Sequence, residues 1–413
     1  MNTTEQQDLL FRCGKVFSPA TPINTRDLFA GRTEQIRQAG QAVHTRGQHA
    51  VIFGERGVGK TSLANILKVL LAAENTLVVK INCHQEDAFH KIWHNALSEI
   101  QIIEEMRPGL HPVPTTRASS PAESVGPESG PDDVRRILQR LGRAGDTVII
   151  FDEFDRLQGG KAQRLFADTI KNLSDNAVNT TFVIVGVAND VSGLIAEHAS
   201  IDRSLVQIQM PRMRPGELKE IINKAMHELG MTIRDDALEL IVLLSQGLPH
   251  YTHLVGQESA TTAINAHRKE IALPDVKGGV NTALTNTQHS ILDAYQKATK
   301  GQRKGTLFRQ VLLACAIAEV DEQGYFVSAA VREPLTKIMG KRYEIPGFSQ
   351  HLDKFSSDAT RGPVLERAGT SRRFRFRFIN PLLQPYVIMR GLSDGSLEGD
   401  VLDLLRRKQQ PPY

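Results

Sequence analysis

Eight consecutive residues in the first part of the chain have the types and spacing needed to hold a phosphate group. They match the pattern G-x-x-x-x-G-K-[ST], and they are Gly54, Glu55, Arg56, Gly57, Val58, Gly59, Lys60 and Thr61. The three glycines let the backbone curl so that its N–H groups point inward. Lys60 is then placed to reach the β- and γ-phosphates, and the Thr61 hydroxyl to bind Mg²⁺. The pattern predicts a site for ATP, its product ADP, and Mg²⁺.

The segments on either side of this loop are those that such a site needs. Residues 50–53 are wholly apolar and predict a buried strand, and residues 62–71 have the pattern of a helix. Ser62 opens that helix, whose first N–H groups add to the phosphate site.

A second chemical constellation follows an apolar strand expected at residues 147–151. This strand ends in Asp152 and Glu153. Ligands bind at the carboxyl ends of the strands in open parallel sheets, so Asp152 is predicted to join Thr61 in holding Mg²⁺. Glu153 is predicted to orient or deprotonate the attacking water.

Two further residues are candidates for the chemistry of hydrolysis. Asn189 follows a strand expected at 181–187 and can bond the γ-phosphate or the water; a polar turn residue is the alternative. Arg203 is the candidate arginine finger that completes a neighbouring subunit's site, and an Arg in a surface salt bridge is the alternative.

Nucleotide-binding residues are also expected outside the loop. The segment 28–36 precedes the first strand, and its Phe29, Gly31 and Arg32 are predicted to fold over the adenine; a plain helix start with a turn glycine is the alternative. Far downstream, Gly247 provides a turn, Pro249 fits the first turn of a helix, and His250 can point at the phosphates or the base.

Strands that alternate with helices around the phosphate loop predict an α/β fold, a three-layer P-loop core with a parallel sheet. We expect this nucleotide-binding domain at residues 1–212, with a partly irregular lead-in over 1–27 and a helix from 84 to about 106. A mobile insertion is expected at 108–131, where large apolar residues are almost absent. A helical lid at 213–285, a winged-helix domain at 286–395 and a tail at 396–413 complete the expected organisation.

Basic residues gather in the expected winged helix. Residues 286–395 contain 17 Lys and Arg against 10 Asp and Glu. Strict alternation of Phe and Arg over 372–378 predicts a strand with Phe facing a core. The candidate DNA-binding residues are Arg372, Arg373, Arg375, Arg377, Lys341, Arg342 and Lys354. A solvated basic face, or a winged helix that docks on protein, is the alternative.

Bulk properties point to a cytoplasmic protein without a membrane segment. The net charge of +4 is small, so contact with nucleic acid depends on local charge. Cys13, Cys83 and Cys315 are few and far apart, as in a reducing compartment. The first residues lack the pattern of a signal peptide, and no apolar run approaches the roughly 20 residues that span a bilayer.

The order of these segments resembles that of the initiator-type AAA+ ATPases of the origin-recognition (Orc/Cdc-like) group, and also that of their relatives, the STAND signalling ATPases. The similarity covers about residues 25–395: the segment at 28–32, the phosphate loop, the acid pair, Asn189, Arg203, a lid and a winged helix. In the origin-recognition group the winged helix grips duplex DNA. Gly247-Leu248-Pro249 stands where initiators carry an arginine sensor, and this G-x-P form is more similar to STAND proteins.

Two functions follow from this resemblance. The first is an initiator-like ATPase that couples its nucleotide state to duplex DNA through the winged helix. The second is a signalling or defence ATPase whose winged helix contacts protein partners. In both, self-association with ATP brings Arg203 to a neighbour's site, so hydrolysis is expected to be slow in the monomer. A scaffold that holds its nucleotide and hardly hydrolyses it is a third interpretation.

Overall fold

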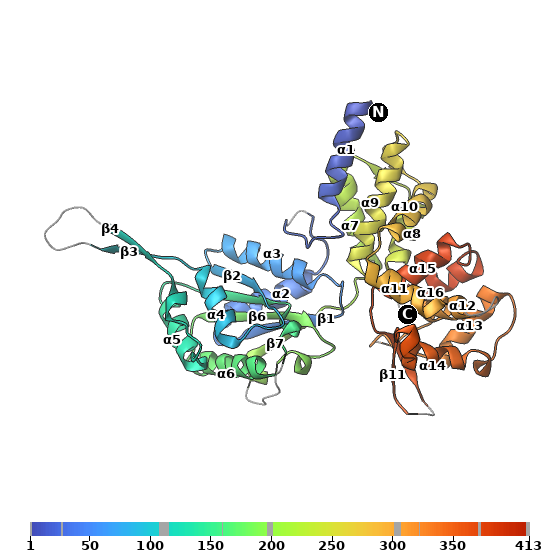
Figure 1. The fold of residues 1–413 in the computed structure, drawn as a ribbon. Coiled ribbons are helices and arrows are strands. Elements are labelled where there is room, and N and C mark those ends of the chain that lie inside the picture. The colour runs from blue at the N-terminus through green and yellow to red at the C-terminus, as the bar shows by residue number, and fades with distance from the viewer. Residues whose placement is uncertain are drawn as a thin grey trace. The chain divides into compact units, whose positions relative to one another are not determined.

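The protein is described by a computed structural model over residues 2–25, 28–106, 115–158, 160–195, 201–300, 307–321, 323–370 and 373–409. The chain divides into two compact units (Figure 1). The sheet unit comprises Pro22–Glu55 and Gly59–Pro211. The helical unit comprises Met1–Thr21, Arg56–Val58 and Arg212–Tyr413.

A parallel sheet of five strands, in the order β2-β5-β6-β1-β7, forms the middle of the sheet unit (Figure 1). The strands are β1 (His49–Gly54), β2 (Leu77–Asn82), β5 (Thr147–Asp152), β6 (Thr180–Val187) and β7 (Leu205–Gln209). β1 and β5 are buried along their whole length, as expected for strands covered on both faces. The expected α/β fold with a parallel sheet is confirmed.

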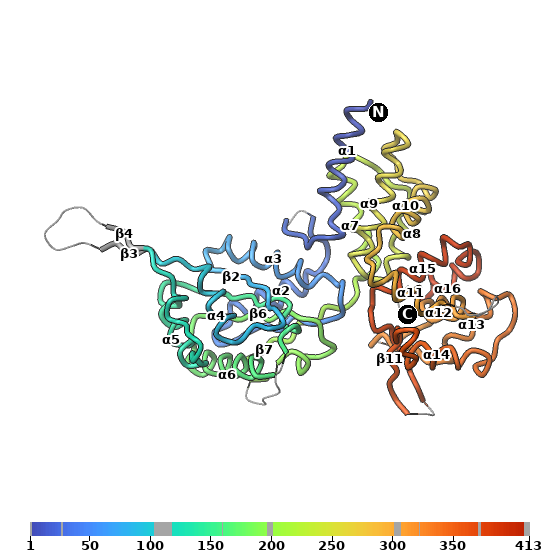
Figure 2. Tube along the Cα trace, viewed as in Figure 1, coloured from blue at the N-terminus to red at the C-terminus, as the bar shows by residue number. Residues whose placement is uncertain are grey.

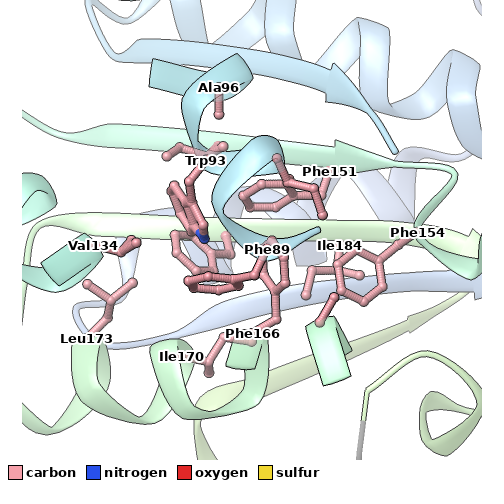
Figure 3. Close-up of a cluster of buried hydrophobic side chains, with 14 of the residues drawn as sticks. Phe89, Trp93, Ala96, Val134, Phe151, Phe154, Phe166, Ile170, Leu173 and Ile184 are labelled. Carbon is pink, nitrogen blue, oxygen red and sulfur yellow. The ribbon is translucent and has the colours of Figure 1, made fainter. Parts of the chain in front are cut away.

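Helices cover both faces of this sheet. They are α2 (Thr33–His44), α3 (Lys60–Ala73), α4 (Phe89–Ser98), α5 (Pro131–Leu141) and α6 (Lys161–Asp175). On one face, Phe151 and Ile184 pack with Phe89 and Trp93 of α4 and Phe166 of α6 in one aromatic core (Figure 3). The alternate strand residues point to the other face, where α2 and α3 contact the strands. The sheet unit therefore has three layers, with the sheet between two layers of helices.

The segment between α4 and α5 differs from its prediction. α4 ends at Ser98, and β3 (Ile102–Met106) pairs with β4 (Thr115–Ser119) in an antiparallel hairpin whose strands run side by side (Figure 2). A short 3₁₀ turn, η1 (Pro121–Ser124), buries Ala122 beside α4, and the Ser120 hydroxyl donates to the Leu97 carbonyl. The expected insertion thus includes β4 and η1 from residue 115 onward, while 108–114 lies outside the described residues.

Three short 3₁₀ turns link the remaining elements of the sheet unit. They are η2 (Phe154–Arg156), η3 (Val191–Gly193) and η4 (Asp202–Ser204).

Closely packed helices make up the first part of the helical unit. These elements are α1 (Thr3–Val16), α7 (Pro215–Leu229), β8 (Thr232–Ile233), α8 (Asp235–Ser245), α9 (Pro249–Asn265), β9 (Glu270–Ile271) and α10 (Leu273–Thr285). Gly279 of α10 allows a close approach to α9, because a Cβ there would lie 2.7 Å from the Ser259 nitrogen.

Helix α1 belongs to this helical unit rather than to the sheet unit. The sequence predicts a partly irregular lead-in attached to the first domain, whereas residues 3–16 form a helix that contacts α7 and α9. Its apolar side is short: the helix buries Leu9 and Cys13, and Phe17 is buried directly after it, at the C-cap. A stripe this short becomes helical because a tertiary partner covers it, which local pattern does not reveal.

The last part of the helical unit has the topology of a winged helix. Its elements are α11 (His289–Thr299), α12 (Phe308–Ile317), β10 (Phe326–Val327), α13 (Ser328–Met339), η5 (Ile345–Gly347), α14 (Ser349–Ser357), η6 (Ala359–Arg361), β11 (Leu365–Ala368), β12 (Arg375–Phe378), α15 (Leu383–Ser393) and α16 (Asp400–Gln409). The small antiparallel sheet has the order β10-β12-β11. Phe376 and Phe378 are buried, as their alternation with Arg predicts. Among the described helices, none has the length and apolarity needed to cross a membrane.

Candidate nucleotide site

The glycine-rich loop connects the end of β1 to the start of α3. Gly54 approaches the backbone of Met210 so closely that a Cβ would lie 2.5 Å from the Met210 carbonyl oxygen. Gly57 and Gly59 have φ angles of 88° and 95°, in the left-handed region that favours glycine. Gly59 is the N-cap of α3, so the loop leads directly into the N-terminus of a 14-residue helix. Such a terminus attracts anions through its N–H groups and dipole.

The Lys60 ammonium is held inside this loop. Its Nζ donates to the carbonyl oxygens of Gly54 at 3.0 Å and Glu55 at 2.7 Å, and the residue is buried. A single cation is therefore fixed against the loop backbone by local hydrogen bonds.

Asp152 ends β5 with a carboxylate that is only 2% exposed. Thr61, the second residue of α3, donates from its hydroxyl to Asp152 Oδ1 at 3.4 Å. Lys80 of β2 places its Nζ 2.9 Å from Asp152 Oδ2. Thus the structure brings together Thr61 and Asp152, which the sequence paired as candidate metal ligands, and adds a lysine that the sequence did not predict.

Glu153 has a left-handed backbone, with φ of 56°, which a residue other than glycine adopts at a cost of about 1–3 kcal/mol. Its N–H donates to Asp152 Oδ1 at 2.9 Å. Its side chain is 39% exposed and lies 3.2 Å from the Arg156 guanidinium. The turn therefore directs Asp152 into the protein while the next carboxylate stays open to water.

Asn189 follows β6, the strand that lies between β5 and β1. Its side chain is exposed. Asp155 fixes the end of β6, since its Oδ1 accepts a hydrogen bond from the Val187 N–H at 2.8 Å. Asn189 therefore follows β6, between the end of β5 with Asp152 and the end of β1 with the phosphate loop.

The segment that was expected over the base is fixed to the sheet unit. Gly31 and Arg32 have φ angles of 63° and 61°, and Arg32 is buried with its guanidinium donating to the Pro211 carbonyl at 2.7 Å. Phe29 is half-buried. Ser62 accepts a hydrogen bond at its hydroxyl from the Ile23 N–H at 3.2 Å, which attaches the preceding segment to the start of α3.

Pro249 and His250 open α9 in the helical unit, with Pro249 in the first turn. The His250 ring packs edge-on against Tyr251, and its Nδ1 lies 2.8 Å from the Pro19 carbonyl oxygen. Burial lowers the pKa of His250, so its neutral form is favoured near neutral pH. Arg203 lies in η4, and its side chain is exposed.

Most of the basic residues expected to touch DNA have partners within the winged helix. Arg375 pairs with Asp321 at 3.2 Å and Arg377 with Glu366 at 2.6 Å, and both guanidinium groups lie over the Tyr325 ring. Arg342 pairs with Glu344 at 2.7 Å, Lys341 lies over Tyr343, and Lys354 lies over Phe308. Arg373 is exposed, and Arg372 lies outside the described residues.

Sequence reasoning missed Lys80, Asp155 and Arg156 of the sheet unit. Lys80 is the most informative of these, because register places it on β2 two residues before Asn82, the partner of Asp152. The sequence shows that Lys80 is a lysine within a mostly apolar strand. It does not show that β2 pairs with β5, which brings Lys80 to Asp152.

Solved structures were compared with the whole chain. The Walker-type ATPase of Pyrococcus abyssi is 15% identical, with 90% of this chain and 99% of that chain covered and a TM-score of 0.51. The ORC1 protein of Aeropyrum pernix, solved in complex with DNA, is 14% identical, with 92% and 95% covered and a TM-score of 0.46. Cdc6p of Pyrobaculum aerophilum is 16% identical, with 93% and 98% covered and a TM-score of 0.44. At such identities the first match describes the fold alone.

Sequence comparison is more specific. No curated protein matches the chain significantly. A family model described as Novel STAND NTPase 1 matches residues 22–335, which is more than half of the chain and includes the loop, Asp152 and the lid. The chain therefore belongs to the Novel STAND NTPase 1 family.

Proposed function

We propose that the protein is an ATP-dependent molecular switch that binds ATP with Mg²⁺ on the loop at 54–61 and hydrolyses it slowly. The observation that carries this proposal is the meeting of Thr61 and Asp152 beside a glycine loop that holds the Lys60 ammonium. Phosphate oxygens can replace the carbonyls as partners of Lys60, and the first N–H groups of α3 can bind the same anion. ADP would occupy the same loop after hydrolysis.

The donor set fits Mg²⁺. A carboxylate and a hydroxyl are hard oxygen ligands, and this cation accepts one or two of them together with phosphate oxygens and water. Thr61 and Asp152 would hold the ion, which supplies charge neutralisation at the phosphates. Asp152 is buried, and a buried carboxylate needs a cation or hydrogen-bond donors as partners.

We assign hydrolysis to Glu153 and Asn189, which follow β5 and β6 at the carboxyl ends of the strands, and to Arg203, which precedes β7 at the amino ends and would serve a neighbouring subunit. Glu153, the exposed member of the acid pair, would take the proton of the attacking water. Asn189 would bond the water or the γ-phosphate, and Arg203 would act on a neighbouring subunit's nucleotide. Phe29, Gly31 and Arg32 would border the adenine, and Pro249 and His250 would carry the nucleotide state into the lid.

Two kinds of partner are candidates for the winged helix. Initiator-like gripping of duplex DNA is one candidate, and contact with a protein is the other. The ion pairs of Arg375 with Asp321 and of Arg377 with Glu366 favour the protein candidate, because these arginines are neutralised within the domain. Lys341 and Arg373 are exposed, so their charges are available for contact with DNA phosphates.

A salt-dependent duplex shift assay separates the two candidates. DNA gripping predicts binding at low salt that weakens steeply with salt and drops several-fold in a variant carrying Lys341→Ala and Arg373→Ala. A matched control carries Lys219→Ala and Lys224→Ala in α7. Wild-type protein that ignores DNA at low salt, with and without ATP, leaves the protein-partner candidate.

Binding of nucleotide itself is tested through Lys60. Lys60→Ala should weaken binding of a fluorescent ATP analogue at least tenfold, whereas Lys91→Ala, on the exposed side of α4, should not change it. Equal affinity of wild type and Lys60→Ala would contradict the proposed site.

A further inference from the structure

We propose that Lys80 is a resident counter-ion of Asp152 that occupies this carboxylate when no divalent cation is bound, and that must leave it when Mg²⁺ binds. This inference rests on the proposed nucleotide function of the same site. It concerns a regulatory residue that the phosphate-loop and acid-pair patterns do not include.

Lys80 is placed at Asp152 by sheet register. β2 pairs in parallel with β5, so the end of β2 runs beside the end of β5, with Asn82 opposite Asp152. Side chains at 80 and 82 point to the same face, since residues two apart in a strand share a face. The Lys80 Nζ accordingly lies 2.9 Å from Asp152 Oδ2 and donates to Asn82 Oδ1 at 3.3 Å.

Burial makes this ion pair different from an ordinary surface pair. The side chains of Lys80 and Asp152 are 13% and 2% exposed. Screening by water is weak at such positions, and removal of one partner leaves a charge that is buried and uncompensated. Asp152 has its other oxygen bonded by the Thr61 hydroxyl and the Glu153 N–H, so Lys80 supplies the positive charge at the remaining oxygen.

The same carboxylate cannot serve the ammonium and a divalent cation equally well. Both need Asp152 oxygen, and two cations close together repel each other strongly where the dielectric constant is low. Mg²⁺ binding therefore competes with Lys80 for Asp152.

A cleft beside Lys80 can accommodate its ammonium group after it leaves Asp152. This cleft has a volume of about 380 Å³ and is lined by Asn24, Asn65, Lys68, Val69, Lys80 and Asn82. Asn82, whose side-chain oxygen Oδ1 already accepts a hydrogen bond from Nζ, also lines this cleft. A four-carbon stem with free rotation lets the ammonium turn into the cleft while it keeps this bond.

Two consequences follow from the competition. Without Mg²⁺, Lys80 offsets the negative charge of Asp152 and so permits nucleotide to bind beside a buried carboxylate. When Mg²⁺ binds, it must break the ion pair of Lys80 with Asp152, and this cost lowers the affinity of the site for Mg²⁺. Lys80 thus reduces the dependence of nucleotide affinity on the divalent cation.

The experiment compares Lys80→Met, which keeps the stem and removes the charge, with Lys68→Met. Lys68 lines the same cleft from the exposed side of α3, so the control removes the same charge from the same opening. The dissociation constant of ATP is measured by calorimetry in excess EDTA and in Mg²⁺. The quantity compared is the dissociation constant in EDTA divided by the dissociation constant in Mg²⁺. Lys80→Met should raise this ratio at least tenfold over wild type, and Lys68→Met should change it less than twofold. An unchanged ratio in Lys80→Met, or the same rise in both variants, would overturn the proposal.

A second readout needs no nucleotide. Thermal unfolding of the sheet unit is followed by the fluorescence of Trp93, which lies in its core. Without ligand, Lys80→Met should unfold at a lower temperature than wild type, and Asp152→Asn in the same chain should restore most of the loss. Failure of ATP to bind wild type would refute the nucleotide function, whereas absence of this rescue would refute the Lys80–Asp152 pairing, so the two failures are distinguishable.

Discussion

At the residue scale, charged side chains at the carboxyl ends of β1 and β5 have defined hydrogen-bond and ion-pair partners. Lys60 rests on loop carbonyls, and Asp152 is shared by Thr61, the Glu153 N–H and Lys80. Glu153 differs from its neighbour, since it is exposed and its backbone is strained. This contrast between adjacent acids supports separate roles for them in cation binding and in proton transfer.

Glu153→Gln should therefore separate hydrolysis from binding. We expect turnover of ATP to fall about 10²–10⁴-fold, as for loss of a general base, while the dissociation constant of ATP stays within a few-fold. Glu128→Gln, at an exposed position of the same unit, is the matched control. Steady-state phosphate release and calorimetry measure the two quantities, and equal turnover of Glu153→Gln and wild type would favour the scaffold that hardly hydrolyses.

His49 predicts an acid-dependent loss of stability in the sheet unit. Burial lowers the pKa of His49 to about 3, and its Nδ1 accepts a hydrogen bond from the Phe182 N–H at 2.9 Å. In the unfolded chain the pKa is about 6.5, so below that pH the unfolded state binds a proton that the folded state does not, and stability falls. Between pH 7 and pH 5 this residue should remove about 2 kcal/mol from the free energy of unfolding.

The measurement is denaturant unfolding followed by Trp93 fluorescence at pH 7 and pH 5. His49→Asn keeps an acceptor near the Nδ1 position and should lower the pH dependence by this amount. His84→Gln, at an exposed position, should leave it unchanged. The same pH dependence in all three proteins would contradict the assignment.

At the scale of elements, close helix packing determines the shape of the helical unit. Gly278 and Gly279 are neighbours in α10, but a Cβ at Gly279 would lie 2.7 Å from a backbone nitrogen of α9, whereas one at Gly278 would make an ordinary 3.4 Å contact with Thr262. Backbone cannot yield as a flexible side chain does. The interface therefore depends on one glycine of the two.

Gly279→Ala should destabilise the protein by about 1–3 kcal/mol, as for overpacking in a tight interface. Gly278→Ala should be neutral or stabilising by up to about 1 kcal/mol, because alanine favours a helix more than glycine does. Thermal unfolding followed by circular dichroism tests the pair. Equal effects of the two substitutions would show that α9 and α10 do not approach as the structure has them.

Sequence patterns predicted those elements whose signals are local. The strand before the loop, the loop, α3 and the strand that ends in Asp152 each carry their own signal, and so do Phe376 and Phe378 in the wing. Docking of α1 on α7 and α9 and the contact of Lys80 with Asp152 depend on partners distant in sequence. The partner of Arg375, Asp321, is likewise distant in sequence, whereas Glu366 is the cross-strand partner of Arg377 and depends on the register of the hairpin. Local patterns thus located the candidate site but not its charge balance.

At the scale of the whole molecule, the chain combines a sheet unit that carries the phosphate loop with a helical unit that carries a winged helix. The chain belongs to the Novel STAND NTPase 1 family. The proposed switch requires that self-association and nucleotide state be linked.

Arg203 is the test of that link. Arg203→Ala should abolish the rise of specific ATPase activity with protein concentration and leave the activity of the dilute monomer unchanged. Arg143→Ala, exposed in the sheet unit, is the control. Sedimentation velocity with a non-hydrolysable ATP analogue shows whether assembly occurs at all; monomer at every concentration would exclude action of Arg203 on a neighbour.

Calorimetric titration of nucleotide-stripped protein with ATP in the presence of Mg²⁺ tests directly whether the loop holds a nucleotide. The loop at 54–61, with Lys60 in place and Thr61 beside Asp152, predicts saturable heat at one site per chain, with heat lost in Lys60→Ala. Absence of binding heat in folded wild-type protein would show that the loop at 54–61 does not bind ATP.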